Sequence, residues 1–245
     1  NIVKVLAVLC VLCSSRNPRA RDNNNWRLWL TEYDHKLTDI VDDLNKQHSG
    51  AVFSTDNQFA LMTEDEFAAF VKGSFQHEAP KRQLRGDNVQ LTLTQAQQEA
   101  TGVDWSTTKC MSPVRNQGSC GSCWSFLVNV GQTVDIQGES ALQSALDKQP
   151  VTVVVESGNN VWRNYKSGVV QSCPGAQSDH AVIAVGYGTK DGQQHFKIKN
   201  SWGTGWGEQG YMYLKRGVGG KGMCNMAEMP AYSIPLPCKR SFGRR

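Results

Sequence analysis

Apolar residues recur at intervals of three and four positions near the start of the chain, between positions 26 and 44. The members of this stripe are Trp26, Trp29, Leu30, Tyr33, Leu37, Ile40, Val41 and Leu44. Such spacing is typical of an amphipathic helix that buries one face. The stripe therefore predicts a helix over this stretch.

A second helix is indicated by Thr63 and Glu66, which have the spacing of a capping box. Apolar residues follow the pair at helical intervals, and Gly73 is expected to end the helix. The surrounding residues 16–98 are polar and hold no catalytic constellation. An ordinary helical domain is one interpretation of this region.

The second half of the chain has shorter apolar runs. Every residue of Val151–Val155 is β-branched, and this run predicts a buried strand. Further strand-like segments, separated by glycine-rich turns, are His180–Val185, His195–Lys199 and Tyr211–Lys215. Leu142–Leu146 predicts a helical piece, and a longer helix is expected to begin at Cys123 and run to about Gly138. Helices followed by several short strands favour an α+β fold.

Composition and charge narrow the function classes. The 245 residues are 39% hydrophobic with a mean hydropathy of −0.45, which fits a soluble globular protein. The net charge of +4 is modest and gives no reason to expect a nucleic-acid partner. Residues 80–100 are typical of an exposed linker, and the basic residues 239–245 are assigned no function.

The first residues have the character of a targeting segment. A lysine precedes the apolar run Val5–Cys13, which is too short to span a bilayer and is followed by two serines. We interpret residues 1–20 as a secretory signal that lacks its first residues; the alternative is a buried strand or helix. A secreted or a lysosomal or vacuolar location is expected, by an oxidising route where disulfides can form. No membrane span is expected.

The candidate chemistry centres on Cys123, which follows the glycine-rich turn Gln117–Ser122 and begins an apolar run. A thiol at a helix N-terminus has a lowered pKa, because free N–H groups and the helix dipole favour the thiolate. The other interpretations of Cys123 are half of a disulfide or a buried thiol. Gln117 could bring an amide donor to the same place.

Two more stretches could complete a catalytic set. His180 follows an aspartate and precedes an apolar strand, so it could hold a proton as the base beside a thiolate. Asn200 could orient its ring, as the third member of a triad does. Trp202 could shield the bond between them from water. A structural histidine, a turn asparagine and a packing tryptophan are the plainer interpretations.

These stretches resemble the papain family (cathepsin L-like) of cysteine proteases. The sequence Cys120-Gly121-Ser122-Cys123-Trp124 matches the signature of that family around its nucleophile. The matching blocks are Pro113–Phe126, Pro150–Glu156, Gly168–Gly188 and Phe196–Gly217, with a weaker match to the propeptide motif at Asp56–Gly73.

The resemblance implies a two-part papain-like fold: a truncated helical part that carries Cys123, and a β-barrel-like part that carries His180 and Asn200. A helical propeptide that blocks the cleft would precede it. The implied segments are the signal at 1–20, the inhibitory propeptide with its linker at 21–98, the peptidase at 99–238 and a basic tail at 239–245. Polypeptide substrates, the chain's own propeptide and cystatin-like inhibitors are the implied partners, and no cofactor is implied.

Substrate contacts and a disulfide are also implied by the resemblance. Gly121 matches a main-chain contact of the S1 site, and Val151 and Ala181 match walls of the S2 pocket, with Trp202 beside them. Both wall residues are small and apolar, so we expect a preference for substrates with an apolar residue two positions before the cleaved bond. Cys173 and Cys224 match the disulfide of the family's β part.

The chain departs from the family in one respect. The family's His and Asn lie about 130–150 residues beyond the Cys, whereas His180 and Asn200 follow Cys123 at roughly half that distance or less. A block of about 75 residues is therefore missing after the nucleophile helix. Its loss is expected to uncover apolar residues of that helix, among them Val134.

Two classes of function follow from these observations. The first is a cysteine endopeptidase made as a zymogen, which the intact Gln117, Cys123, His180 and Asn200 favour. The second is a non-catalytic homologue, either a decoy that binds inhibitors or a misfolded or incomplete product, which the missing block favours. A metal site built from Cys120, Cys123 and His180 is weakly indicated, because no second cysteine pair has suitable spacing, and no metal is expected.

Overall fold

The computed structural model describes residues 26–75, 102–108, 111–118 and 133–233. Its strands are β1 (Ala51–Phe53), β2 (Val103–Asp104), β3 (Thr133–Asp135), β4 (Val151–Val155), β5 (Tyr165–Val170), β6 (His180–Lys190), β7 (Gln193–Lys199), β8 (Tyr211–Lys215) and β9 (Ala231–Ser233). Its α-helices are α2 (Trp26–Gln47), α3 (Glu64–Phe75), α5 (Glu139–Leu146) and α6 (Asn160–Asn164). The class is α+β, as expected.

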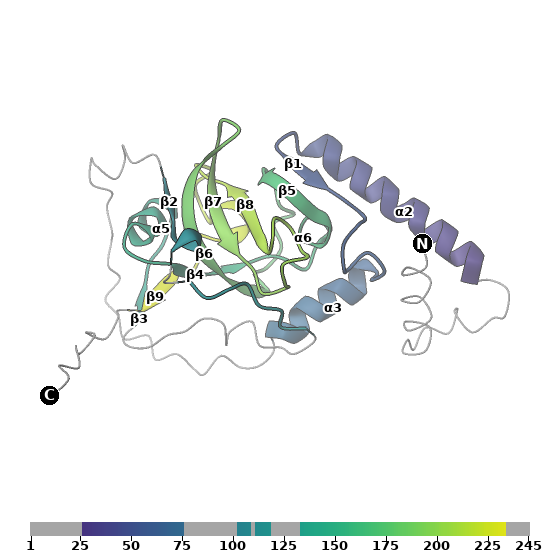
Figure 1. The fold of residues 1–245 in the computed structure, drawn as a ribbon, viewed down its shortest axis with the longest axis horizontal. Coiled ribbons are helices and arrows are strands. Elements are labelled where there is room, and N and C mark those ends of the chain that lie inside the picture. The colour runs from purple at the N-terminus through teal and green to yellow at the C-terminus, as the bar shows by residue number, and fades with distance from the viewer. Residues whose placement is uncertain (1–25, 76–101, 109–110, 119–132, 234–245) are drawn as a thin grey trace, which may run out of the picture.

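One sheet organises the described residues. Its strand order is β1-β5-β8-β7-β6-β4-β9-β3, and β2 pairs with β6 off this path. The pairings are antiparallel except for β5 with β8, which run parallel. The order has two ends, so the described part of the β region is an open sheet where a barrel-like one was expected. Figure 1 shows the sheet in the middle, with α2 and α3 at one end and α5 at the other.

The strands and helices arise from the patterns that predicted them. In β4, residues 151, 153 and 155 are buried and the residues between them are partly exposed, which is the two-residue alternation of a strand. The expected strand beginning at His180 continues to Lys190 and turns back into β7. The expected strand at 211–215 has the same bounds as β8.

The two N-terminal helices also form where they were expected. In α2, Leu37, Val41 and Leu44 are buried. At the start of α3 the capping box is present: Thr63 Oγ1 accepts from Glu66 N at 3.2 Å, and Glu66 Oε2 accepts from Thr63 N at 2.9 Å.

Two expected helix ends are wrong. Gly73 does not end α3, which continues to Phe75. The helix expected to run from Cys123 to about Gly138 does not reach that point, because residues 133–135 form β3 and pair with β9. Residues 119–132 lie outside the described ones. Pairing with β9 is the tertiary constraint that decides this segment, and it buries Val134, which was expected to lose its cover.

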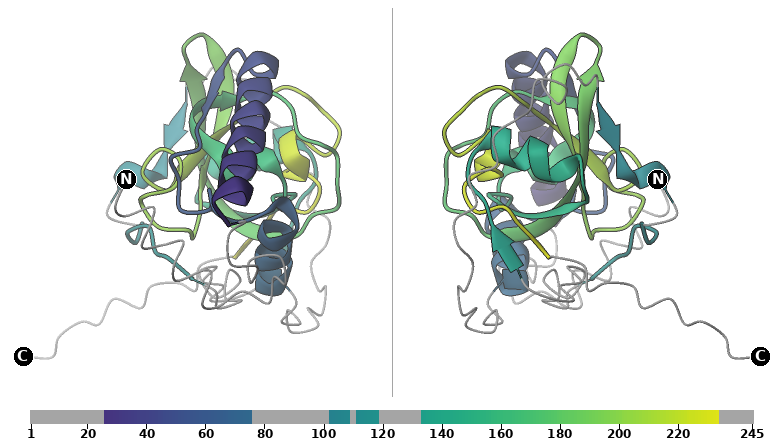
Figure 2. Two further views of the ribbon diagram at one scale, coloured as in Figure 1. Left: turned by 90° about the vertical axis from the view of Figure 1, so that its right-hand side faces the viewer. Right: turned by 90° about the vertical axis from the view of Figure 1, so that its left-hand side faces the viewer.

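Residues from the N-terminal region and from the sheet share one hydrophobic core. Phe53, Phe59 and Phe67 belong to the same buried cluster as Val155 and Ile198. Figure 2 shows α2 lying across the edge of the sheet in the left view, with α3 below it. The N-terminal region is therefore packed as part of the fold.

Strand β1 attaches this region to the edge of the sheet. Ala51 pairs with Gly168 and Val52 with Ser167, and a bulge follows before Phe53. Gly168 has a φ of +83°, and a Cβ there would collide with the backbone of Gly50. Only glycine allows β1 to approach β5 this closely.

The end of α2 is fixed by a buried histidine. His48 is 1% exposed, and its Nδ1 accepts the backbone N–H of Gln171 at 3.3 Å. Its Nε2 lies 3.2 Å from Ser172 Oγ. Because a backbone N–H can only donate, the contact requires an unprotonated Nδ1. Burial accordingly lowers the pKa of His48.

This geometry predicts that acid loosens the N-terminal region. The pKa of His48 is lowered from 6.5 in the folded protein, so the folded state resists protonation and loses stability as the pH falls below about 6.5. The protection of the Ala51–Phe53 amides from hydrogen exchange, corrected for the intrinsic pH dependence of exchange and measured in full-length Cys123→Ala, should fall over this range. His48→Gln should flatten that dependence.

His35→Gln is the matched control, because His35 is exposed on the same helix. It should behave like the parent. Equal pH dependence in His48→Gln and in the parent would contradict the assignment of this contact as the acid-sensitive one.

Candidate active site

His180 is the first residue of β6, and the neighbouring backbone fixes its place. It pairs with Val155 of β4, and Asp179 N donates to Val155 O at 2.9 Å. The Asp179 carboxylate accepts the N–H groups of Ser157 and Gly158 at 2.7 and 2.9 Å. The turn before the histidine is therefore pinned to the end of β4.

Asn200 directly follows β7 and meets the ring of His180. His180 Nε2 lies 2.8 Å from Asn200 Oδ1, and the same oxygen accepts Ser201 N at 2.8 Å. An amide oxygen accepts hydrogen bonds, so Nε2 carries a proton in this contact. The other ring nitrogen, Nδ1, has no hydrogen-bond partner among the described residues. It is the atom that could exchange a proton with a reactant.

Aromatic rings enclose this bond. The Trp202 ring lies parallel to the His180 ring, with centroids 5.0 Å apart and planes at 19°. Trp162 meets the His180 ring edge-on at 6.4 Å and stacks on Trp206 at 5.8 Å. His180 is 0% exposed, and burial lowers its pKa, while the Asn200 bond and the nearby Asp179 oppose that shift.

Gln117 lies beside the same pair. Its N–H donates to Ser201 O at 2.9 Å, and Ser201 Oγ donates to Gln117 Oε1. The preceding residue pairs with Trp202 in an antiparallel bridge. The oxygen of the Gln117 amide is thus held by Ser201. The structure brings Gln117, His180, Asn200 and Trp202 close to one another.

The predicted wall residues do not meet as expected. Ala181 pairs with Val154, and paired residues point to the same face of a sheet. Val151 pairs with Ala184 and is 0% exposed, so it belongs to the core. Val154, which is partly exposed, is the residue beside Ala181 that the sequence interpretation missed. No local signal in the sequence identifies it, because the register between β4 and β6 is set by partners distant in sequence.

Cys123 and Gly121 lie outside the described residues, and the structure does not place them. The expected disulfide between Cys173 and Cys224 is present, with Cα atoms 5.3 Å apart. Within the described ranges, no three His, Cys, Asp or Glu side chains are grouped as metal ligands. No helix in the same ranges is long and apolar enough to cross a membrane.

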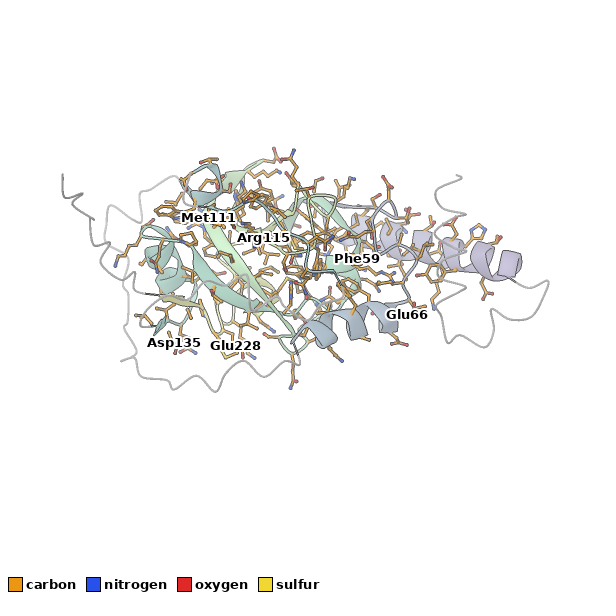
Figure 3. All side chains as sticks on the ribbon, turned by 60° about the horizontal axis from the view of Figure 1, so that its bottom comes forward. Phe59, Glu66, Met111, Arg115, Asp135 and Glu228 are labelled. Atoms are coloured by element: carbon orange, nitrogen blue, oxygen red, sulfur yellow. A yellow bond between two sulfur atoms is a disulfide. The ribbon has the colours of Figure 1, made fainter. Side chains whose placement is uncertain are left out.

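The N-terminal region covers the site. Phe59, Phe67 and Phe70 contact the outer side of Trp202, with ring centroids 5.3, 5.6 and 6.3 Å away. Gln58 Nε2 donates to Trp202 O at 2.7 Å. Figure 3 shows Phe59 above the helix beside the Glu66 label, well to the right of Asp135.

Polar contacts fix the same cover to α6. Arg163 Nη1 donates to Met62 O at 2.8 Å, and Asn160 Nδ2 donates to Glu64 Oε2 at 3.0 Å. The segment before α3 and the start of α3 are thus tied to the residues that follow β4. The side chains of this cover contribute to the complete burial of His180 and Trp202.

Comparison with known proteins agrees with the site. The sequence pattern of the family described as papain family cysteine protease matches residues 100–132 and 127–234. Two matched stretches are consistent with a block missing between them.

Related sequences come from plants and animals. Chymopapain of Carica papaya is 30% identical, over 78% of this chain and 76% of its own length. That alignment is 270 positions long, which exceeds this chain and so requires gaps in it. Digestive cysteine proteinase 1 of Homarus americanus is 28% identical, over 72% of this chain and 79% of its own length.

Solved proforms share the fold. The proform of the Amb a 11 cysteine protease of ragweed pollen has a TM-score of 0.66 at 22% identity, covering 82% of this chain and 87% of the other. Digestive procathepsin L2 of Tenebrio molitor has a TM-score of 0.70 at 19% identity, covering 95% and 99%. The matched family pattern, the relatives and the fold lead to one conclusion: this chain belongs to the papain family of cysteine proteases, with the fold of their proforms.

Proposed function

We propose that this chain is the zymogen of a cysteine endopeptidase in which Cys123 is the nucleophile, His180 the proton carrier, Asn200 its orienting partner and Gln117 an oxyanion donor. The observation that carries the proposal is the bond between His180 Nε2 and Asn200 Oδ1, 2.8 Å long and enclosed by Trp202. Because Nε2 is engaged in this bond, Nδ1 of His180 is the atom that would exchange a proton with the thiol.

The first half of the reaction forms an acyl-enzyme. The Cys123 thiolate adds to the carbonyl carbon of a peptide bond, and the oxygen takes the negative charge. The Gln117 amide and the Cys123 N–H stabilise that oxyanion. His180 then gives its proton to the departing amine as the C–N bond breaks. In the second half, water gives a proton to His180 and adds to the thioester, and the acid leaves with regeneration of the thiolate.

Asn200 and Trp202 act on this cycle through His180. The Asn200 oxygen accepts from Nε2 in both protonation states of the ring, so the ring keeps its orientation while Nδ1 gains and loses a proton. Trp202 excludes water that would compete for the same bond. A decoy would have no use for this pairing, so the non-catalytic alternative is not favoured.

The segment roles follow from the same proposal. Residues 1–20 would direct the chain to a secreted or a lysosomal or vacuolar location, and residues 21–98 would be the inhibitory propeptide. Residues 99–238 would be the peptidase, followed by the tail at 239–245. Substrates would be polypeptides, and cystatin-like proteins would bind the uncovered cleft. Val154 and Ala181 would form an apolar S2 wall, with Gly121 at S1.

Covalent labelling tests the nucleophile and the cover together. A thiol-reactive epoxide should label Cys123 after the N-terminal region is removed, and much more slowly in the intact chain, because the cover excludes the reagent from the site. Mass spectrometry of peptides identifies the labelled residue. Cys123→Ala is the control for other thiols. Absence of labelling at Cys123 in processed, folded protein would contradict the assignment.

Kinetics test the oxyanion donor. Gln117→Ala should lower kcat by about 10²–10³ with little change in KM, because the lost donor acts on charge that develops only in the transition state. Gln137→Ala, a substitution of an exposed glutamine, is the matched control and should retain the parent rate. A change confined to KM would assign Gln117 to substrate binding.

A further inference from the structure

A second concave site lies on the sheet away from the cleft. A pocket of about 300 Å³ is lined by residues of β2, β6, β7 and β8, among them Tyr187, Lys190, His195, Lys197 and Tyr213. His180 begins β6, and Tyr187, the first residue of that strand to line the pocket, lies seven positions further on, roughly 23 Å along the strand. The catalytic proposal uses none of these residues.

Two glycines create the space. In the pairing of β6 with β7, Gly186 stands opposite Lys197 and Gly188 opposite His195. Side chains at such positions would project over the same face. A Cβ at Gly186 would collide with Val103 of β2, so its absence lets β2 cross the sheet there. Strand β2 becomes one wall of the pocket, with Val103 and Asp104 in its lining.

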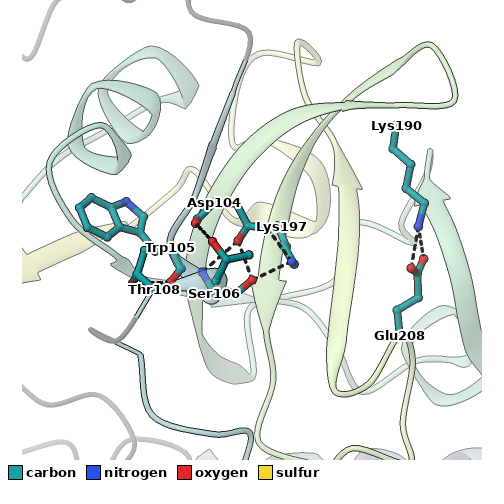
Figure 4. Close-up of polar contacts among 8 residues, drawn as sticks. Asp104, Trp105, Ser106, Thr108, Lys190, Lys197 and Glu208 are labelled. Atoms are coloured by element: carbon teal, nitrogen blue, oxygen red, sulfur yellow. Dashed lines mark hydrogen bonds and ion pairs between the residues drawn. The ribbon is translucent and has the colours of Figure 1, made fainter.

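Two lysines flank the aromatic wall of the pocket. Lys190 Nζ lies 4.3 Å and Lys197 Nζ 5.9 Å from the centroid of Tyr213. Figure 4 shows each lysine with its partners: Lys190 bonds both oxygens of Glu208 at 2.5 and 2.6 Å, and Lys197 bonds Asp104 and Ser106, each at 2.8 Å. An ammonium group has three N–H donors. Each lysine therefore retains a donor beyond these bonds.

A buried histidine adds a polar atom that lacks a partner. His195 is 8% exposed and meets the Tyr213 ring edge-on at 4.8 Å. Its Nδ1 has no hydrogen-bond partner within the described part of the chain. Burial lowers the pKa of His195, a backbone hydrogen bond with Gln193 opposes that shift, and the positive charges of Lys190, Arg216 and Lys197 lower the pKa further.

The lining offers a ligand two kinds of contact. Lys190 and Lys197 each pair with one acid, Glu208 and Asp104, and each keeps one N–H donor beyond these bonds. The two ammonium groups lie 4.3 and 5.9 Å from the centroid of the Tyr213 ring, which supplies an aromatic surface beside them. The volume is at the small end of the range for ligand pockets.

We propose that this pocket binds a small aromatic carboxylate, with the carboxylate on Lys190 and Lys197 and the ring against Tyr213. Bound there, the ligand would connect β2 to β6, β7 and β8. It would stabilise the fold at a place separate from the cleft.

The test compares ligands of equal shape and different charge. Calorimetric titration of full-length Cys123→Ala should detect saturable binding of benzoate and at least about tenfold weaker binding of benzamide, because the neutral amide forfeits the charge-assisted bonds. Benzoate should also raise the midpoint of thermal unfolding, and benzamide should not.

Variants locate the binding. Lys190→Gln should lower the affinity for benzoate about tenfold. Lys166→Gln, at an exposed lysine of β5, should leave that affinity unchanged. Thr189→Trp alters no charge and places a large ring at an exposed lining position, so it should abolish binding even if Lys190→Gln fails to fold. Equal affinity for benzoate and benzamide, or undiminished binding in Thr189→Trp, would overturn the proposal, as would absence of saturable benzoate binding.

Discussion

The bond between His180 and Asn200 depends on the exclusion of water, and much of the structure around it contributes to that exclusion. The two residues lie at opposite ends of neighbouring strands in sequence, yet the antiparallel pairing of β6 and β7 places the start of one beside the end of the other. A buried imidazole without a partner would be costly, because it would lose hydration without compensation. The Asn200 oxygen removes that cost at Nε2, and the Trp202 ring keeps water from competing.

The N-terminal region contributes to the same enclosure and to the stability of the whole domain. Its phenylalanines pack on the outer side of Trp202, while β1 extends the sheet by one strand at β5. Alignment with its relatives requires gaps within this chain, so the core has fewer residues to supply apolar surface. Burial of each large side chain contributes about 1.5–3 kcal/mol. Phe53, Phe59 and Phe67 are therefore a substantial share of a typical folding free energy of about 5–15 kcal/mol.

Local signals in the sequence predicted the elements whose structure is decided locally. The Thr63 and Glu66 capping box, the β-branched run of β4 and the bounds of β8 are examples. The residues of the site were predicted through a family resemblance, and the structure brings four of them together. The register between strands could not be predicted from the sequence, because it is set by partners distant in sequence. For that reason Val151 was matched to the S2 wall together with Ala181, whereas the residue that pairs with Ala181 is Val154. The β3 segment was misassigned for the same reason, since its partner β9 follows almost a hundred residues later.

The enclosure of His180 has an inner and an outer layer, and they have different origins. Trp162 and Trp206 form the inner layer, and both belong to the sheet region, with Trp206 Nε1 bonded to Trp162 O at 2.9 Å. The outer layer on Trp202 comes from the N-terminal phenylalanines. Removal of the N-terminal region would take away the outer layer alone. The outer side of Trp202 would then be exposed to water, while the inner layer would still enclose the bond between His180 and Asn200. That division would let the ring of His180 keep its orientation after removal of the N-terminal region, because the contacts with Trp162 and Asn200 remain.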